Sequence, residues 1–214
     1  QNIFEFILDE ALKLADSITG NRKRSEKVLP ISLALFVFIL VNNWLGLLPG
    51  IGTIGFIEAE GTHRVFVPLF RGGTADLNTT LALALFAVVA SHVLGAITVG
   101  LWDHFNKFVN IKSFLAIPGK IRKDVTIVLV NPIKAFVGII EIIGEFAKVA
   151  SLSFRLFGNI FAGEVLLASM MLLFAFILPL PFMFLEIIVG LIQALIFAML
   201  TLVFMTIATS HEEH

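Results

Sequence analysis

Long apolar runs are the feature of this 214-residue sequence that most limits its possible folds. The four runs are Leu29 to Leu48, Leu77 to Trp102, Val165 to Leu185 and Ile187 to Ser210. They hold no Asp, Glu, Lys or Arg, and Glu186 alone separates the last two. About 20 apolar residues in a helix cross the roughly 30 Å hydrocarbon core of a bilayer. Barrel strands are only about ten residues long and alternate in polarity. The sequence therefore predicts an all-α integral membrane protein.

Composition excludes several other classes of protein. Hydrophobic residues make up 58% of the chain and charged residues 14%, whereas a soluble domain has about a quarter charged. The absence of cysteine rules out disulfides, thiolate metal sites and a cysteine nucleophile. A formal net charge of -1 gives no reason to expect a nucleic-acid partner. The histidines outside the apolar runs lack metal-ligand spacing, and there is no phosphate-binding loop of the G-x-x-x-x-G-K type. We expect no metal or cofactor, and nucleotide chemistry would lie on other chains.

The N-terminal segment, residues 2–19, has a different pattern. From Ile3 to Ile18, apolar residues alternate at helical spacing with Glu5, Asp9, Glu10, Lys13 and Asp16. This pattern predicts an amphipathic helix on the membrane surface; the alternative is a soluble helix docked on a partner. Charges at this spacing are unlike the apolar core of a signal peptide, so we expect Gln1 to be an internal start.

Loop charges predict the orientation, because short loops rich in Lys and Arg stay on the cytoplasmic side. Asn21 to Lys27 and Phe105 to Asp124 are both strongly basic, which places them inside. Gly50 to Asp76 has no positive excess and is placed outside. The first two transmembrane helices are expected at residues 29–48 and 77–103.

The rest of the chain predicts a helical hairpin. Asn131 to Leu178 reads as one helix, and Pro179 and Pro181 then break it. Such a helix would be about 72 Å long, more than twice the hydrocarbon thickness, so we expect it to be strongly tilted. A return helix over residues 182–210 brings the C-terminus to the cytoplasmic side. We expect residues 1–214 to form a single membrane domain.

A polar stripe marks the long helix. At 100° per residue, one side carries Glu141, Glu145, Lys148, Ser151, Arg155 and Asn159. No Lys or Arg follows Arg155 in the sequence. An arginine at membrane depth costs several kcal/mol and usually faces a polar cavity or a carboxylate. The alternative is a structural ion pair with Glu141 or Glu145.

Two further carboxyl groups lie near the predicted outer side. Glu164 is nine residues beyond Arg155 and therefore faces the opposite way, about 13.5 Å along the axis. Glu186 opens the return helix and shares a face with Gln193. Glu164 and Glu186 could meet across the hairpin, where two carboxyls tend to share a proton, as a proton relay requires. The alternative is two carboxyls solvated separately in a wet cleft.

Three other residues have two possible roles each. Asp76 and Asn78 precede an apolar run, which indicates a helix cap, with a role at the outer proton entrance as a possible addition. His92 lies inside a predicted span and could relay protons. A hydrogen-bonded histidine within the bundle is the simpler interpretation.

The segment from Ser151 to Glu164 reads Ser-Leu-Ser-Phe-Arg-Leu-Phe-Gly-Asn-Ile-Phe-Ala-Gly-Glu. It resembles the signature of the a subunit in the membrane (Fo) sector of F-type ATP synthases, the stator half of the proton channel. Supporting matches run in family order: Asn42-Asn-Trp-Leu-Gly-Leu-Leu-Pro49, Thr74-Ala-Asp-Leu-Asn78, Asn131-Pro-Ile133, Gln193-Ala-Leu-Ile-Phe197 and Glu212-Glu-His214. The signature around Arg155 is highly specific, and the resemblance covers nearly the whole chain.

The resemblance implies a role for each matching residue. Arg155 corresponds to the family's essential arginine, Asn159 to the asparagine beside it and Gln193 to the glutamine that faces it. Glu164 corresponds to the half-channel carboxylate, and Glu186 occupies a position that holds histidine in some members and glutamate in others. The family usually has one more transmembrane helix before the amphipathic segment.

The resemblance also implies partners and a location. The partners are the lipid bilayer, the proteolipid subunits of the c-ring, the peripheral-stalk b subunits and the remainder of the ATP synthase. The location is the bacterial inner membrane. Such a chain has no catalytic site and couples ion flow to rotation and ATP synthesis.

Two other function classes compete with an ion-translocating stator. A self-contained secondary transporter could use Arg155 to bind an anion, but the inverted repeats expected of one are not found. A passive membrane scaffold leaves a mid-membrane arginine and two membrane glutamates unexplained. Co-isolation with a small two-helix proteolipid and with ATPase subunits would favour the stator.

Overall fold

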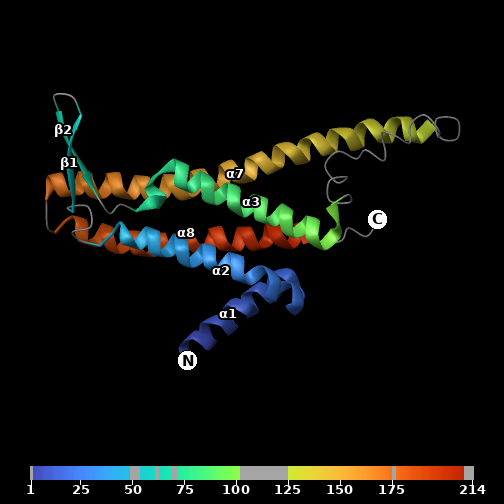
Figure 1. Cartoon of the computed structure of the whole chain (residues 1–214), viewed down its shortest axis with the longest axis horizontal. Coiled ribbons are helices and arrows are strands. Elements are labelled where there is room, and N and C mark those ends of the chain that lie inside the picture. The colour runs from blue at the N-terminus through green and yellow to red at the C-terminus, as the bar shows by residue number, and fades with distance from the viewer. Residues whose placement is uncertain are drawn as a thin grey trace.

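The computed structural model of the chain describes residues 2–48, 54–60, 63–68, 72–101, 125–174 and 177–209. Its elements in chain order are α1 (Asn2–Thr19), α2 (Arg22–Leu45), β1 (Gly55–Glu60), β2 (His63–Pro68), η2 (Gly73–Ala75), α3 (Leu77–Val99), α7 (Val125–Leu173) and α8 (Pro179–Thr209). The long helices run along the long axis of the molecule, and α1 projects from one side (Figure 1).

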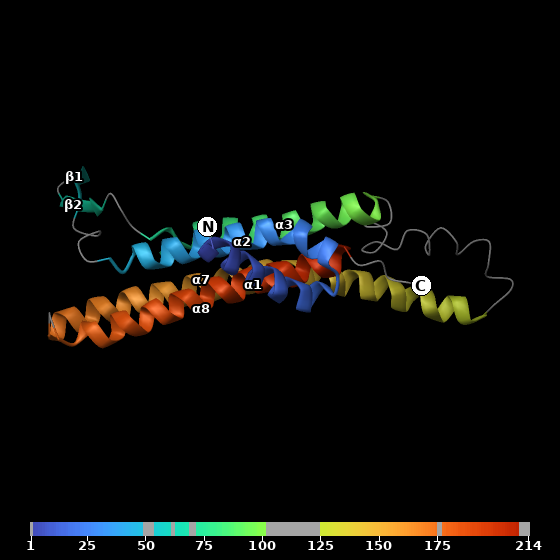
Figure 2. The same ribbon diagram turned by 90° about the horizontal axis from the view of Figure 1, so that it is seen from below.

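The long helices form two layers, with α2 and α3 on one side of the α7–α8 hairpin (Figure 2). Helix α2 packs on α8, whereas α3 packs on both α7 and α8. We call one end of the bundle the hairpin end, where α2 and α7 finish, α3 and α8 begin, and β1 and β2 lie (Figure 1). The opposite end, where α1 meets α2, is called the α1 end.

Small residues allow the two layers to approach closely. Ala84 and Ala87 on α3 and Ala194 on α8 are fully buried, and they pack with Ile39, Leu152 and Leu156 in one core cluster. Small side chains at helix contacts are typical of membrane bundles, where van der Waals packing between backbones replaces the hydrophobic effect.

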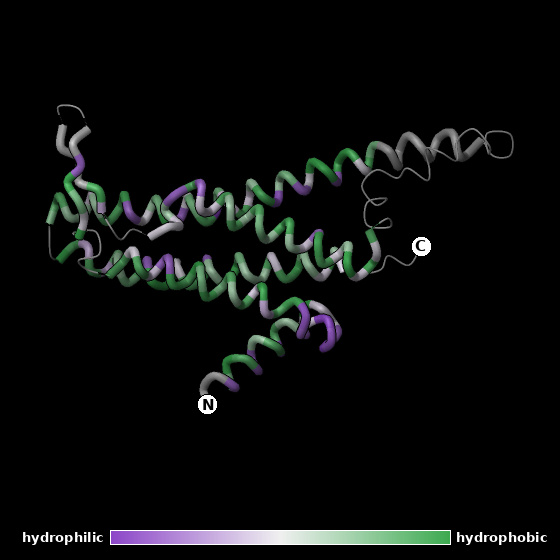
Figure 3. Tube along the Cα trace, in the orientation of Figure 1, coloured by the Kyte–Doolittle hydropathy of each residue, from purple (hydrophilic) through white to green (hydrophobic). Residues whose placement is uncertain are grey.

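Apolar residues make up most of the length of the long helices (Figure 3). Leu85 and Phe86 of α3, Leu172 of α7 and Phe184 of α8 are each more than half exposed. Within the described residues, α2, α3, residues 136–173 of α7, and α8 are long and apolar enough to cross a membrane. The predicted all-α membrane architecture is confirmed.

Helix boundaries differ from those predicted at several points. Helix α2 begins at Arg22 rather than Leu29, because the Asn21 side chain accepts a hydrogen bond from the Lys23 amide at 3.0 Å and caps a polar first turn. Helix α3 ends at Val99, where Gly100 has a φ of 104° that L-residues rarely adopt.

The two helices of the hairpin also have shifted boundaries. Helix α7 begins at Val125, before the predicted start at Asn131, so that Pro132 lies inside it; neighbouring helices let membrane helices tolerate proline. Helix α7 ends at Leu173 rather than Leu178. Helix α8 begins at Pro179 rather than Phe182, since proline is well suited to the first position of a helix.

Helix α7 is continuous through its whole length of 49 residues, with no break near Ala150. At 1.5 Å per residue it spans about 74 Å. Its strong inclination to the membrane remains a prediction from this length.

A small antiparallel hairpin, which the sequence analysis did not predict, stands at the hairpin end (Figure 1). Its pairing runs from Gly55 with Pro68 to Glu60 with His63. The glycine-rich composition of residues 50–76 obscured the strand pattern, because glycine is depleted in strands.

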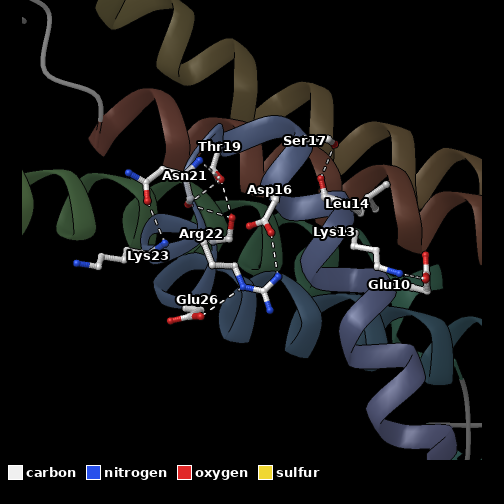
Figure 4. Close-up of polar contacts among 11 residues, drawn as sticks. Glu10, Lys13, Leu14, Asp16, Ser17, Thr19, Asn21, Arg22, Lys23 and Glu26 are labelled. Atoms are coloured by element: carbon white, nitrogen blue, oxygen red, sulfur yellow. Dashed lines mark hydrogen bonds and ion pairs between the residues drawn. The ribbon is translucent and has the colours of Figure 1, made fainter.

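Polar contacts and a small apolar cluster hold α1 against the bundle (Figure 4). Arg22 Nη1 lies 2.9 Å from Asp16 Oδ2, and the Thr19 and Ser25 hydroxyls are 2.6 Å apart. Ala15 is fully buried in a cluster with residues of α2 and α8. Phe6 remains 66% exposed. One face of α1 is thus docked and another is free to meet lipid, as an interfacial helix requires.

Acidification is expected to loosen α1. The Ser25 hydroxyl and the Arg22 guanidinium lower the pKa of Asp16, so ionised Asp16 favours the docked helix. This stabilisation is fully present above the unfolded pKa of about 3.9 and is lost as pH falls through the lower folded pKa. The hydrogen-exchange protection factors of α1 should therefore decrease when the pH drops below about 4. The Asp16→Asn variant should not show this decrease. An identical acid response in the variant would contradict the assignment.

Candidate functional site

A cavity at the hairpin end lies among α2, α7 and α8. Its described lining residues are Asn42, Asn43, Gly46, Leu47, Gly72, Ile160, Glu164, Leu167 and Glu186. It offers about 30 Å³ to the centres of water molecules, which is enough for at least one water. The structure thus brings the two carboxyl groups, Glu164 and Glu186, to the wall of one cavity.

Glu186 is the most buried of the described acidic side chains, with 9% of the residue exposed. Its Oε1 has no hydrogen-bond partner within the described residues. The carboxyl group lies directly against Gly163 of α7, and a Cβ at that position would overlap it. A buried polar group is costly unless it is paired with another protein group or with water, so Glu186 needs a polar partner in the cavity.

Two side chains at the end of α2 attach it to α8. Asn43 donates from Nδ2 to the Gly190 carbonyl at 3.0 Å, and Trp44 donates from Nε1 to the Ile187 carbonyl at 3.1 Å. A Cβ added to Gly190 would lie 3.2 Å from the Asn43 Cβ, tighter than most such contacts. Glycine at this position therefore allows Asn43 to reach the backbone one turn beyond Glu186.

Arg155 lies on a different side of α7 and is exposed. Among the described residues its polar contact is with Ser151, whose Oγ lies 3.4 Å from Nη2. Asn159, one turn further along α7, is also exposed. Within the described residues, Arg155 forms no ion pair with Glu141 or Glu145. The structural ion pair considered as an alternative role for Arg155 is therefore not observed there.

Glu145 instead belongs to a separate polar cluster that joins α3 and α7. Its Oε1 lies 2.6 Å from Lys148 Nζ, and its Oε2 lies 3.2 Å from His92 Nε2. Lys148 also lies over the Phe204 ring of α8, 5.0 Å from its centroid. Glu145 and Lys148 therefore face the bundle, whereas Arg155 and Asn159 are exposed. The stripe therefore changes from half-buried at Glu145 and Lys148 to exposed at Ser151, Arg155 and Asn159.

The remaining predicted residues lie apart from the cavity lining. Asp76 caps α3 by accepting a hydrogen bond from the Asn78 amide at 2.8 Å, and both side chains are exposed. Gln193 is half-buried on α8 and forms no hydrogen bond with Arg155 within the described residues. The same part of the chain holds no group of three or more His, Asp or Glu side chains arranged to bind a metal.

Comparison with known proteins decides the family. A family model described as ATP synthase A chain matches residues 1–206. The chain belongs to this family. It is 35% identical to ATP synthase subunit a of Syntrophobacter fumaroxidans over 99% of this chain and 72% of that protein. It is also 35% identical to subunit a of Mycobacterium tuberculosis, over 100% of this chain and 75% of that protein.

Membership of the subunit a family sets the general function. The chain is a multi-pass integral membrane protein and an ion-translocating component of the Fo sector, with no catalytic site of its own. It works within the F-type ATP synthase as a stator subunit of the proton channel. A self-contained secondary transporter and a passive scaffold do not fit this family.

Sequence reasoning missed three residues at this site: Asn43, which lines the cavity, Gly163, which lies against Glu186, and Gly190, which lies against Asn43. Asn43 was noted only as part of the Asn-Asn-Trp motif. Two adjacent asparagines near the end of an apolar span could have indicated a polar contact, because a buried amide needs hydrogen-bond partners. Glycine inside a helix costs about 1 kcal/mol relative to alanine and can mark a close contact. The signal was ambiguous here, because Gly163 and Gly190 have close contacts whereas Gly144 has none within 4 Å.

Proposed function

We propose that the chain provides two offset aqueous half-channels and the arginine that works against the carboxylates of a rotating c-ring. The observation that carries this proposal is the separation of charges on α7. Glu164 lines the cavity with Glu186, whereas Arg155 is exposed on another side of the helix. Nine residues place the two groups about 13.5 Å apart along the axis, too far to neutralise each other.

In this proposal the cavity is part of the outer half-channel. Its lining includes Gly46 and Gly72, which belong to the hairpin end. Protons entering there would reach Glu186 and Glu164, with Asp76 and Asn78 near the entrance. The basic residues Arg22, Lys23, Arg24 and Lys27 begin α2 at the α1 end, which favours an outward hairpin end. This orientation would put the C-terminus in the cytoplasm and suits a bacterial inner membrane.

The inner half-channel would lie on the other side of Arg155 along α7. Glu145 precedes Arg155 by ten residues, about 15 Å along the axis, and it is paired with His92 and Lys148. These partly buried polar groups would hold a water path open toward the α1 end. His92 is thus assigned to the inner side, where its hydrogen bond to Glu145 also ties α3 to α7.

The exposed side of α7 around Arg155 is the surface that we assign to the c-ring. Phe154 is 61% exposed beside Arg155, and Ser151 and Asn159 flank it one turn away in each direction. An arginine exposed to lipid alone would be costly, so this surface requires a partner that supplies carboxylates. Gln193 would complete the polar surroundings of Arg155 from α8, and the peripheral-stalk b subunits would hold the chain stationary.

Accessibility to a charged thiol reagent tests the outer half-channel. The chain has no native cysteine, so Glu164→Cys and Glu186→Cys each carry a single thiol. In the intact complex both should react with a membrane-impermeant methanethiosulfonate added on the outer side, because thiolate forms only where water reaches the thiol. Phe184→Cys is the matched control, since Phe184 is 67% exposed on the apolar surface of α8 and should resist the reagent. Complete protection of both glutamate positions would contradict the proposed half-channel.

A further inference from the structure

The amide group of Asn43 is held in one orientation. Its Nδ2 donates to the Gly190 carbonyl at 3.0 Å, so its Oδ1 occupies the other position. Asn43 is only 4% exposed, and within the described residues Oδ1 has no hydrogen-bond partner. A buried amide oxygen needs a donor, and Asn43 lines the cavity that also contains Glu186.

Glu186, which lines the same cavity, has the same requirement. Its Oε1 is buried and, among the described residues, has no hydrogen-bond partner. Two oxygen acceptors cannot satisfy each other when Glu186 is ionised, so both need a donor that the cavity can supply. Water supplies two donors and also accepts, so it fits Glu186 in both protonation states. The cavity offers about 30 Å³ to water centres, above the roughly 10–15 Å³ that one water requires.

We propose that this cavity binds an ordered water molecule between Asn43 Oδ1 and Glu186 Oε1, and that Asn43 is a positioning residue for proton transfer at Glu186. The inference rests on the proposed outer half-channel and adds to it a specific water site and a residue of α2. Asn43 accepts one hydrogen of the water and so fixes the direction of the other hydrogen and of the lone pairs.

The proton step is balanced by the water itself. Protonated Glu186 gives its proton to the oxygen of the bridging water. That water releases its other hydrogen as a proton to the next water or carboxylate in the cavity and is regenerated. The Asn43 oxygen only accepts a hydrogen bond, because an amide does not bind a proton at working pH.

Variants of Asn43 and Trp44 distinguish the positioning of the water by Asn43 from the attachment of α2 to α8. Asn43→Leu and Trp44→Phe each remove one hydrogen bond from α2 to the backbone of α8, so both should lower the thermal stability of the complex slightly. Only Asn43→Leu removes the oxygen that holds the water. In reconstituted vesicles it should lower proton-driven ATP synthesis about fivefold to tenfold, the equivalent of one hydrogen bond, while Trp44→Phe should stay near normal.

High-resolution cryo-electron microscopy of the intact complex tests the water directly. The expected result is density within about 3.2 Å of both Asn43 Oδ1 and the Glu186 carboxyl, lost in Asn43→Leu. A direct protein partner for Asn43 Oδ1, or equal losses of synthesis in Asn43→Leu and Trp44→Phe, would overturn the inference.

A third variant distinguishes this inference from the proposed function. Normal synthesis by Asn43→Leu together with a strong loss in Glu186→Leu would refute the water site and still support the proposed half-channel. Normal synthesis by both variants would also refute the half-channel role of Glu186.

Discussion

Arg155→Ala is expected to reduce proton-driven ATP synthesis by at least about 100-fold in reconstituted vesicles and to raise passive proton conductance. A ring carboxylate that crosses lipid must be neutral, because a charge at the bilayer centre costs about 3 kcal/mol even on the lenient scale, equivalent to about 100-fold in rate. In the proposed mechanism, the fixed guanidinium of Arg155 stabilises the ionised form of the ring carboxyl group, so that this group can release its proton on one side before it is reprotonated from the other. The same positive charge repels protons that would pass straight between the half-channels.

Lysine is expected to replace Arg155 poorly. It keeps a charge, but it loses the planar fork and can be deprotonated on burial, which arginine cannot. Arg155→Lys should therefore fail nearly as badly as Arg155→Ala in synthesis. Its passive leak should be smaller, because some positive charge remains.

The control for Arg155 is a cation that lies outside the proposed channel. Lys13→Gln removes an exposed charge on α1 that is paired with Glu10, and synthesis should remain near normal. Synthesis, passive conductance and assembly are measured together for every variant. Near-normal synthesis by Arg155→Ala in a fully assembled complex would refute the proposed role of the arginine.

Gly163→Ala is expected to lower proton-driven synthesis about 10- to 100-fold without preventing assembly. A Cβ at this position would overlap the Glu186 carboxyl group. The overlapped atoms are the end of a flexible side chain, so Glu186 should swing away while the helices keep their packing. Displacing a reacting group by about 1 Å can cost 100-fold in rate, which is why the effect on transport should exceed the effect on stability.

A second substitution should partly restore function. Gly163→Ala combined with Glu186→Asp shortens the acidic side chain and makes room for the added methyl group, so synthesis should exceed that of Gly163→Ala alone. The matched control is Gly144→Ala, on the same helix, where a Cβ would meet no atom within 4 Å. A Gly163→Ala complex with normal synthesis, or a double variant no better than the single one, would contradict this geometry.

The sequence was informative wherever a property depends on neighbouring residues. Uncharged runs predicted the membrane helices, because length and hydropathy alone decide whether a helix can span lipid. The spacing of Arg155 and Glu164 predicted opposite sides of one helix, because 100° per residue is a property of the helix itself. Element ends were predicted less well, as at Arg22 and Val125, since caps and neighbouring helices extend a helix beyond its apolar part.

The sequence by itself therefore determined the membrane fold, the family signature and the polar residues able to take part in ion transfer, including Arg155 and Glu186. Only the tertiary structure decided which of these residues meet. Asn43 and Gly190 are 147 positions apart, and Gly163 meets Glu186 across the hairpin. Such pairs depend on the crossing angle and axial register of packed helices, which side-chain packing sets and no periodic pattern along one helix encodes.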